Sequence, residues 1–331
     1  MSELLRRRDR LCLANRLVNR LTHRAFPSSD FHGTRVYRGY GPQNALAEVL
    51  ADFRPDHLVV AGGSDWAFAL AAQCARTGIP TAFYFHELVS VRKLTDFTSL
   101  EGIALIANSA YTAREVRELS GRDVAVVPPL VDLAAYRTET TRRHVTMVNP
   151  RKMKGGQRAL ELAQACPDIP FVIVEAWHTH APFVRQLREA ARQVPNVTWR
   201  PLTPDMRSVY AGTRIMLVPS EWEETWGRVV TEAQVSGIPA LATNYAALPE
   251  SVGPGGLLVA RDAPLAEWVR ALRRLWDDHA LYETLSRRAL EHAARPEAQP
   301  AHAAATFLAG LHQSVVRQTF QGQSPRASMR S

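Results

Sequence analysis

Cysteine and long apolar runs are scarce in this 331-residue chain, and Asp-x-Asp pairs are absent from it. Its three cysteines, Cys12, Cys74 and Cys166, are odd in number and lack the spacing of metal ligands, so we expect reduced thiols in a cytoplasmic protein. No apolar run approaches the ~20 residues that span a bilayer. No Asp-x-Asp pair is present to bridge a metal ion to a diphosphate, so we expect no metal. The length and the ordinary globular composition predict two domains.

The net charge of +8 lies at the two ends of the chain. Residues 1–24 hold seven arginines against Glu3 and Asp9, and residues 317–331 hold three arginines and no acid. The body between these ends is therefore neutral. A nucleic-acid-binding protein would be expected to concentrate positive charge on its folded body, so we predict no nucleic-acid partner.

Lysine is nearly absent, and its distribution is uneven. The chain has three lysines against 37 arginines, and Lys152 and Lys154 share one loop, residues 149–156. Where arginine has almost displaced lysine, a pair of lysines indicates a use for a compact point charge. Chance clustering is the alternative for so few residues.

Short apolar strands alternate with helices in both halves of the chain. This alternation is typical of parallel sheets covered by helices on both faces, so we predict an α/β fold with two doubly wound, Rossmann-like domains. We expect an N-terminal domain over 1–135, a polar linker at 132–144, a second domain over 142–300, a helix over 301–318 and a disordered tail over 319–331. The strands are expected near residues 34–37, 57–61, 80–85, 103–107 and 124–127, then 145–148, 171–174, 197–199, 215–218, 240–242 and 256–259.

Ligands of such folds bind beyond the carboxyl ends of the strands, and the polar motifs of this chain fall there. Loop 149–156 follows strand 145–148, and Glu224 follows strand 215–218. His86 and the run 62–65 occupy the same place in the first half. We therefore expect these motifs to line one cleft between the two domains.

The segment 219–232 reads as an acidic loop followed by a helix. Gly227 opens this helix, so the amides of Gly227, Arg228 and Val229 have no intrahelical partner and predict a phosphate site. Glu224 and Glu232 are eight residues apart, which would let one carboxylate hold sugar hydroxyls and the other a ribose. A surface helix with ordinary acids is the alternative.

This segment and the chain after it contain Pro219-Ser220, Glu224, Trp226-Gly227, Glu232-Ala233, Gly237-Ile238-Pro239, Leu248-Pro249-Glu250 and Gly255 to Val259. Together these residues resemble the donor-binding signature of the retaining glycosyltransferases of family four, which have the GT-B fold. The resemblance implies transfer of a sugar from a nucleotide-diphosphate sugar to an acceptor hydroxyl, with retention of configuration and without a metal or cofactor. It leaves a sugar, a lipid-linked molecule or a natural product as the acceptor.

The resemblance also implies roles for residues in the second half. Glu224 matches the residue beside the anomeric centre, Glu232 the ribose contact, and Lys154 the cation on the diphosphate. The family has an arginine where this chain has Asn149, so either the Asn149 amide replaces a charge or Arg151 moves in beside Lys154. The predicted donor-binding set is Asn149, Arg151, Lys154, Trp226, Gly227, Arg228, Val229 and Glu232, and Glu224, Lys154 and His86 are the predicted catalytic residues.

The first half matches the family less well. His86 lies where the family has a histidine that faces donor and acceptor, although a lone histidine is more often structural. The Asn108-Ser109 pair resembles a family motif, but Ser109 is equally well explained as a helix N-cap. The predicted acceptor-side residues are Gly62, Gly63, Ser64, Asn108 and Ser109.

The chain opens on a basic amphipathic helix near residues 4–24, where the family has a strand and a glycine-rich loop. This helix either packs on the first sheet or rests on the anionic inner face of a membrane. Two other functions stay open: a non-catalytic nucleotide-sugar-binding protein, and a nucleotide-sugar epimerase with the GT-B fold.

Overall fold

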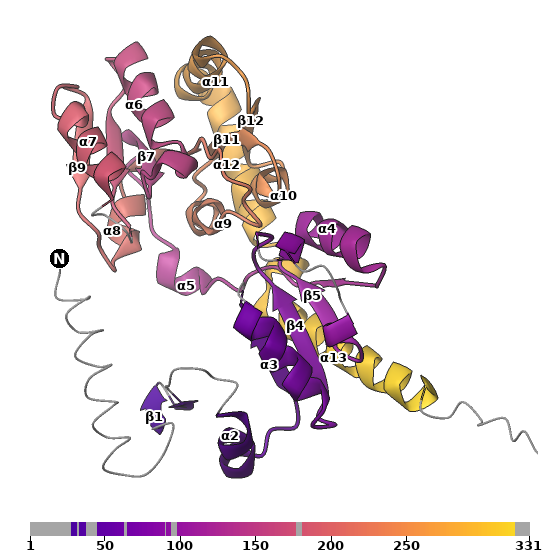
Figure 1. Cartoon of the computed structure of the whole chain (residues 1–331). Coiled ribbons are helices and arrows are strands. Elements are labelled where there is room, and N and C mark those ends of the chain that lie inside the picture. The colour runs from indigo at the N-terminus through magenta and orange to yellow at the C-terminus, as the bar shows by residue number, and fades with distance from the viewer. Residues whose placement is uncertain are drawn as a thin grey trace, which may run out of the picture. The chain divides into compact units, whose positions relative to one another are not determined.

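The computed structural model describes residues 28–31, 33–37, 45–62, 65–89, 91–93, 98–176 and 181–321. The expected helix near residues 4–24, Gly63, Ser64 and the end of the tail lie outside these ranges, so their predicted roles, including a membrane contact, stay predictions. By its contacts the chain divides into two units, residues 1–106 with 308–331, and residues 107–307 (Figure 1). The division falls inside β5 (Ala104–Ala107), so α4 (Ala110–Ser120) and β6 (Ala125–Val126) belong to the second unit.

The second unit is built on a six-stranded sheet of order β12-β11-β10-β7-β8-β9 (Figure 1). Every pair of neighbouring strands is parallel. The chain reverses its direction of travel across the sheet between β7 and β10, which is where such folds bind ligands. The strands are β7 (His144–Val148), β8 (Phe171–Val174), β9 (Val197–Arg200), β10 (Thr213–Val218), β11 (Ala240–Asn244) and β12 (Gly256–Ala260).

Helices bury both faces of this sheet, because alternate strand residues point to opposite sides. In β10, Ile215 and Leu217 join one apolar cluster while Met216 and Val218 join the other. On the first face lie α6 (Gly156–Ala165), α7 (Pro182–Ala191), α11 (Leu265–Asp277) and α12 (His279–Ala293). On the second lie α5 (Leu133–Tyr136), α8 (Met206–Tyr210), α9 (Arg228–Gln234) and α10 (Leu248–Val252). The linker expected at 132–144 thus contains a helical turn, α5, whose N-cap is Asp132.

A four-stranded sheet of order β3-β4-β5-β6 forms from the first half of the chain. Its strands β3 and β4 are parallel, as the alternation predicts. The elements are α2 (Leu46–Phe53), β3 (Leu58–Ala61), α3 (Asp65–Ala75), β4 (Thr81–Phe85), β5 (Ala104–Ala107), α4 (Ala110–Ser120), β6 (Ala125–Val126) and, near the C-terminus, α13 (Pro300–Gln321). Short 3-10 turns lie at Val91–Lys93, Thr98–Leu100, Lys152–Lys154 and Pro296–Ala298.

The expected strand at 34–37 does not join that sheet. It is β2 (Thr34–Tyr37), and it pairs antiparallel with β1 (Ser28–Phe31) in a two-stranded hairpin. Gly33, with φ +76°, makes the turn, and its amide donates to Asp30 Oδ1 at 2.9 Å. So short a connection closes a hairpin, whereas a parallel neighbour requires a crossover of a dozen residues or more.

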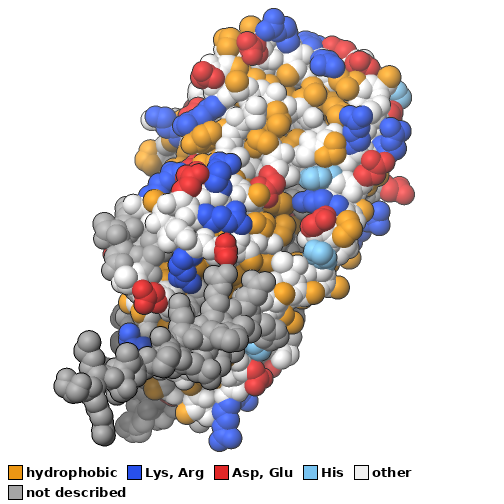
Figure 2. Space-filling view, turned by 90° about the vertical axis from the view of Figure 1, so that its right-hand side faces the viewer, with side chains coloured by type: hydrophobic (Ala, Val, Ile, Leu, Met, Phe, Trp, Pro, Cys, Tyr) orange, Lys and Arg blue, Asp and Glu red, His pale blue; other side chains and the backbone are white. Residues whose placement is uncertain are grey.

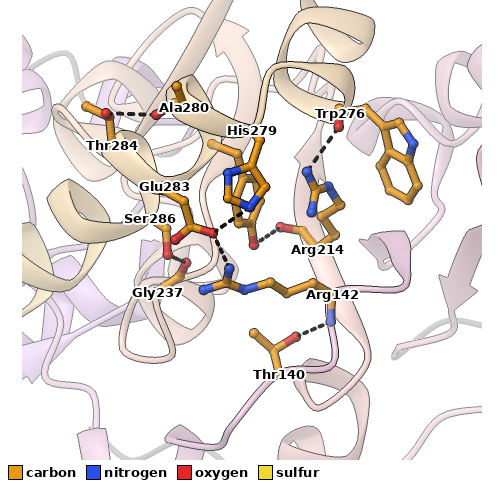
Figure 3. A network of polar contacts seen from close by, with 11 residues as sticks. Thr140, Arg142, Arg214, Gly237, Trp276, His279, Ala280, Glu283, Thr284 and Ser286 are labelled. Atoms are coloured by element: carbon orange, nitrogen blue, oxygen red, sulfur yellow. Dashed lines mark hydrogen bonds and ion pairs between the residues drawn. The ribbon is translucent and has the colours of Figure 1, made fainter.

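A polar network braces the amino end of β10 against α12 (Figure 3). The Arg214 guanidinium lies 4.0 Å from the centre of the Tyr282 ring and donates to the Trp276 carbonyl at 3.0 Å. Arg142, at the end of the linker, pairs with Glu283 at 2.5 Å. Two cations thus meet one aromatic ring and one carboxylate, and they fix β10 at the end away from the polar loops. Across the described ranges, no helix has the length and apolar character needed to cross a membrane.

Candidate functional site

An ion pair joins the two loops that leave the carboxyl ends of β7 and β10. Lys154 Nζ lies 2.5 Å from Glu224 Oε1, although 70 residues separate the two in the chain. The strands are neighbours in the sheet, so their loops meet at the switch point. The side chains are 27% and 13% exposed, so the pair is partly shielded from water but open to a ligand.

Gly155 allows the two loops to approach closely. It has φ +79°, and a Cβ placed on it would lie 1.9 Å from the Pro219 carbonyl oxygen. Any side chain here would collide with backbone that cannot swing away. The loop of Lys154 therefore rests directly on the chain that leads into Glu224.

Hydrogen bonds from the Glu224 loop converge on one carbonyl, that of Met153. The amides of Glu221 and Trp222 donate to it at 3.0 and 2.8 Å. The Ser220 hydroxyl lies 3.3 Å from the same oxygen and 2.9 Å from Glu224 Oε1, and its single proton can serve either acceptor. The backbone of the first loop thus shapes the second, and Ser220 orients the Glu224 carboxylate.

Glu232 lies within α9, which begins after Gly227 (φ +95°), the residue at which the sequence predicts the helix to open. Glu232 is 7% exposed and accepts a hydrogen bond from the Tyr210 hydroxyl at 2.8 Å. Burial raises the pKa of the Glu232 carboxyl, while the bond from Tyr210 and the charge of Arg228 partly offset that rise. The Arg228 guanidinium lies 3.6 Å from Glu232 Oε1. Because Arg228 is itself largely exposed, it compensates the buried charge only weakly.

Replacing Glu232 by glutamine is expected to raise the melting temperature at pH 7–8, by about 2 °C. Because its pKa is raised in the folded state, Glu232 contributes stability that is full below the unfolded pKa and is lost as the pH rises through the folded pKa. Glutamine cannot ionise and still accepts from Tyr210, so the gain should disappear as the pH falls to about 4. Thermal melts across this range test the expectation. Glu189→Gln, at an exposed carboxylate of α7, is the control and should show no such trend.

Asn149 adopts an unusual conformation at the start of the Lys154 loop. Its φ is +66°, its side chain is 9% exposed, and its amide oxygen has no hydrogen-bond partner among the described residues. Its backbone N–H donates to Val174 at 2.9 Å, and its carbonyl accepts from the amide of half-buried Arg151 at 2.8 Å. The loop therefore presents an unsatisfied buried acceptor at the position where the sequence departs from the family.

Trp226 has a different environment from Glu224. Its side chain is 4% exposed, and its indole N–H donates to Thr231 Oγ1 at 3.1 Å. It lines a cavity of about 320 Å³ together with Glu250, His292 and Arg295, whose guanidinium lies 5.8 Å from the ring centre. Figure 2 shows the face on which histidine, basic and acidic side chains gather around an apolar hollow. Neither Lys154 nor Glu224 lines this cavity.

The residues predicted in the first half lie in two places. Exposed His86 follows β4 and Gly62 follows β3, and both belong to the first unit. Asn108 and Ser109 instead begin α4 in the second unit, and Ser109 is the N-cap of this helix, since its hydroxyl accepts from the Thr112 amide at 3.0 Å. Within the described ranges, no group of three His, Cys, Asp or Glu side chains could hold a metal ion.

Sequence reasoning misses several residues of the site. Ser220 belongs to the quoted motif, but the motif assigns it no role, and nothing local to Tyr210 points to Glu232. The hydrogen bond from the Tyr111 amide to Glu250 is also missed; it joins α4 to α10, which lie near each other in Figure 1. Contacts between residues so distant in sequence leave no periodic signal.

Solved structures share this arrangement of two parallel sheets. A glycosyltransferase from Rickettsia africae superposes with a TM-score of 0.69 at 14% identity, over 82% of this chain and 80% of that one. HepE from Anabaena, solved with UDP and glucose, gives a TM-score of 0.62 at 18% identity, over 83% and 80%. The fold is thus GT-B, the two-domain fold of glycosyltransferases.

Family comparisons agree with this class. Residues 5–135 match the model for Glycosyltransferase Family 4, and residues 157–278 match that for Glycosyl transferases group 1. The two models match different halves of the chain, so each half is similar to a domain of the family-four, group 1 glycosyltransferases. The chain is 30% identical over 236 residues to the D-inositol 3-phosphate glycosyltransferase of Nocardia farcinica, and 27% identical over 259 residues to that of Paenarthrobacter aurescens. These alignments cover 59% and 65% of this chain but only 49% and 63% of the relatives.

Proposed function

We propose that the chain transfers a sugar from a nucleotide-diphosphate sugar to an acceptor hydroxyl, with retention of configuration and without a metal ion. The Lys154–Glu224 pair is the observation that supports this most directly. It places a cation and a carboxylate side by side where two neighbouring strands of a doubly wound sheet end. The cation suits the negative charge of a diphosphate, and the carboxylate can accept hydrogen bonds from sugar hydroxyls.

The nature of the donor is supported by the structural neighbours. HepE was solved with UDP and also with UDP-glucose, so uridine diphosphate sugars are the first donors to test. The curated relatives are named for D-inositol 3-phosphate, which adds a phosphorylated polyol to the candidate acceptors. We propose these as classes, beside sugar, lipid-linked and natural-product acceptors.

We propose for these side chains the roles that the family resemblance implies. Lys154 turns from Glu224 toward the leaving diphosphate and neutralises the charge that develops there, as a preorganised cation does in other transfer enzymes. The amides at the start of α9, from Gly227 to Val229, face the same diphosphate. Glu224 contacts the reacting sugar, and Glu232 holds the ribose.

Glutamine variants of the two acids should differ in kind. Glu224→Gln is expected to lower kcat at least tenfold, because its contact lies beside the reacting carbon and strengthens in the transition state. Glu232→Gln should mainly raise the donor KM, because a ribose contact is shared by the ground and transition states. Initial rates at varied donor concentration measure both parameters. Identical changes in kcat and KM for the two variants would refute the assignment.

The function itself is tested with a panel of UDP-, GDP-, ADP- and dTDP-sugars. A true donor should raise the melting temperature of the protein, because it binds the folded state. With acceptor present, that donor should be consumed, the new glycosidic bond should keep the donor configuration by NMR, and excess EDTA should leave the rate unchanged. Stabilisation without turnover would indicate a non-catalytic binding protein. Conversion of the sugar nucleotide to an epimer, without transfer to the acceptor, would indicate an epimerase.

A further inference from the structure

Two side chains at the start of α4 hold the residues on either side of Glu224. The Tyr111 hydroxyl donates to Glu223 Oε1 at 2.5 Å, and the Asn108 amide nitrogen donates to Thr225 Oγ1 at 3.0 Å. These pairs lie 112 and 117 residues apart in the chain, so they are tertiary contacts. The loop between β10 and α9 has no regular structure around Glu224, and its shape depends on such contacts.

The orientation of Asn108 is fixed from its other side. The Thr112 hydroxyl donates to Asn108 Oδ1 at 3.0 Å, so the amide nitrogen is the atom that faces Thr225. Asn108 is 3% exposed, and both ends of its amide are therefore used. A buried amide with both ends bonded holds one rotamer, and it transmits the position of α4 to Thr225.

The start of α4 is itself anchored by Glu250. Its two carboxylate oxygens accept from the amides of Ala110 and Tyr111, at 2.8 and 3.2 Å. A carboxylate at this end of a helix satisfies orphan amides and complements the helix dipole. Glu250 belongs to α10, and Ala247, just before α10, donates its amide to the Glu224 carbonyl at 3.0 Å. The loop that carries Glu224 is therefore tied to α10 twice, through Glu250 and α4 and through the Ala247 amide.

We propose that Tyr111 and Asn108 are positioning residues for Glu224. They touch the side chains before and after it and fix the loop against α4, which Glu250 fixes in turn. Tyr111 contributes most, because a hydroxyl that donates to a carboxylate forms a stronger hydrogen bond than one between neutral groups. The catalytic consequence rests on the proposed function, since a carboxylate displaced by ~1 Å from a reacting centre loses much of its effect. The effect on the loop itself does not rest on it.

Hydrogen exchange tests the brace without any substrate. Tyr111→Phe removes the hydroxyl and keeps the ring. Amide exchange in peptides covering residues 219–227 should become about tenfold faster, as expected for the loss of one charge-assisted hydrogen bond. Tyr282→Phe is the matched control, because it removes a buried hydroxyl that donates to the Arg214 carbonyl at the amino end of β10. It should leave exchange in the loop unchanged. Unchanged exchange in Tyr111→Phe would overturn the proposal.

A double variant shows whether the hydroxyl acts through Glu223. Tyr111→Phe combined with Glu223→Gln should exchange no faster than the faster single variant, because both changes remove the same bond. With a donor that the wild-type protein turns over, Tyr111→Phe should lower kcat about tenfold and change the donor KM less than twofold. Additive effects on exchange, or a change in KM alone, would contradict a positioning role. Failure of the wild type to turn over any donor would count against the proposed function, while the exchange result would still decide the brace.

Discussion

Lys154→Ala is expected to reduce kcat by about 10²–10³-fold, the usual loss when one preorganised donor to a developing negative charge is removed. The variant removes the only side-chain cation that the structure pairs with Glu224 among the described residues. It also leaves the Glu224 carboxylate, 13% exposed, with Ser220 as its remaining side-chain donor. Steady-state kinetics with a donor that stabilises the protein would measure the loss.

Lys152→Ala is the matched control for this variant. Lys152 lies in the same helical turn as Lys154, but its side chain is exposed, and its removal changes the local net charge by the same amount. We expect nearly wild-type kcat from it. Equal losses in the two variants would show that the loop acts only through its overall charge, and near-wild-type turnover in Lys154→Ala would remove Lys154 from the site.

Gly155→Ala should have the largest effect on stability of any single methyl group added near the site. A Cβ at this position would lie 1.9 Å from the Pro219 carbonyl oxygen, and both partners belong to the backbone. Relief requires the two loops to separate, which breaks the bonds to the Met153 carbonyl and the Lys154–Glu224 pair together. We expect a loss of about 3 kcal/mol or more in the free energy of unfolding, together with loss of donor binding. Chemical denaturation and donor-induced thermal shifts would measure the two effects.

Gly121→Ala separates collision from backbone strain. Gly121 also has a positive φ, +66°, but a Cβ there would meet nothing within 4 Å. Its substitution should therefore cost only about 1 kcal/mol, the usual penalty for a left-handed alanine. A similar loss from both variants would mean that the close approach of the two loops does not hold in solution.

Much of the fold can be predicted from local pattern. The parallel strands of the second half are predicted to within two residues, because each is a short run of apolar residues buried on both faces and bounded by turns. The opening of α9 after Gly227 is also predicted from the sequence, and the structure gives Gly227 a φ of +95°. The strand at 34–37 is predicted in the wrong sheet, because apolar pattern does not distinguish a hairpin from a parallel neighbour.

The site is predictable only in part, for a physical reason. Lys154 and Glu224 each follow a strand, and parallel strands end at one edge of the sheet, so the sequence alone indicates that their loops meet. The bonds from Tyr210 to Glu232 and from Tyr111 to Glu223 depend on how helices pack on the sheet. Side-chain contacts of that kind are set by tertiary packing alone. Asn149 is predictable only in part. The sequence shows that this residue departs from the family pattern, whereas its left-handed backbone and unpartnered side-chain oxygen appear only in the structure.

The order of strands in the second sheet also bears on how the protein folds. β7 and β10 are adjacent in space, yet the whole α6–α8 segment is inserted between them in the chain. Their pairing closes a long loop, which is slow and entropically costly, so it should come late in folding. The ion pair between their loops cannot form before that step. Recovery of donor binding after dilution from denaturant would therefore report completion of the second sheet, and no early intermediate should bind the donor.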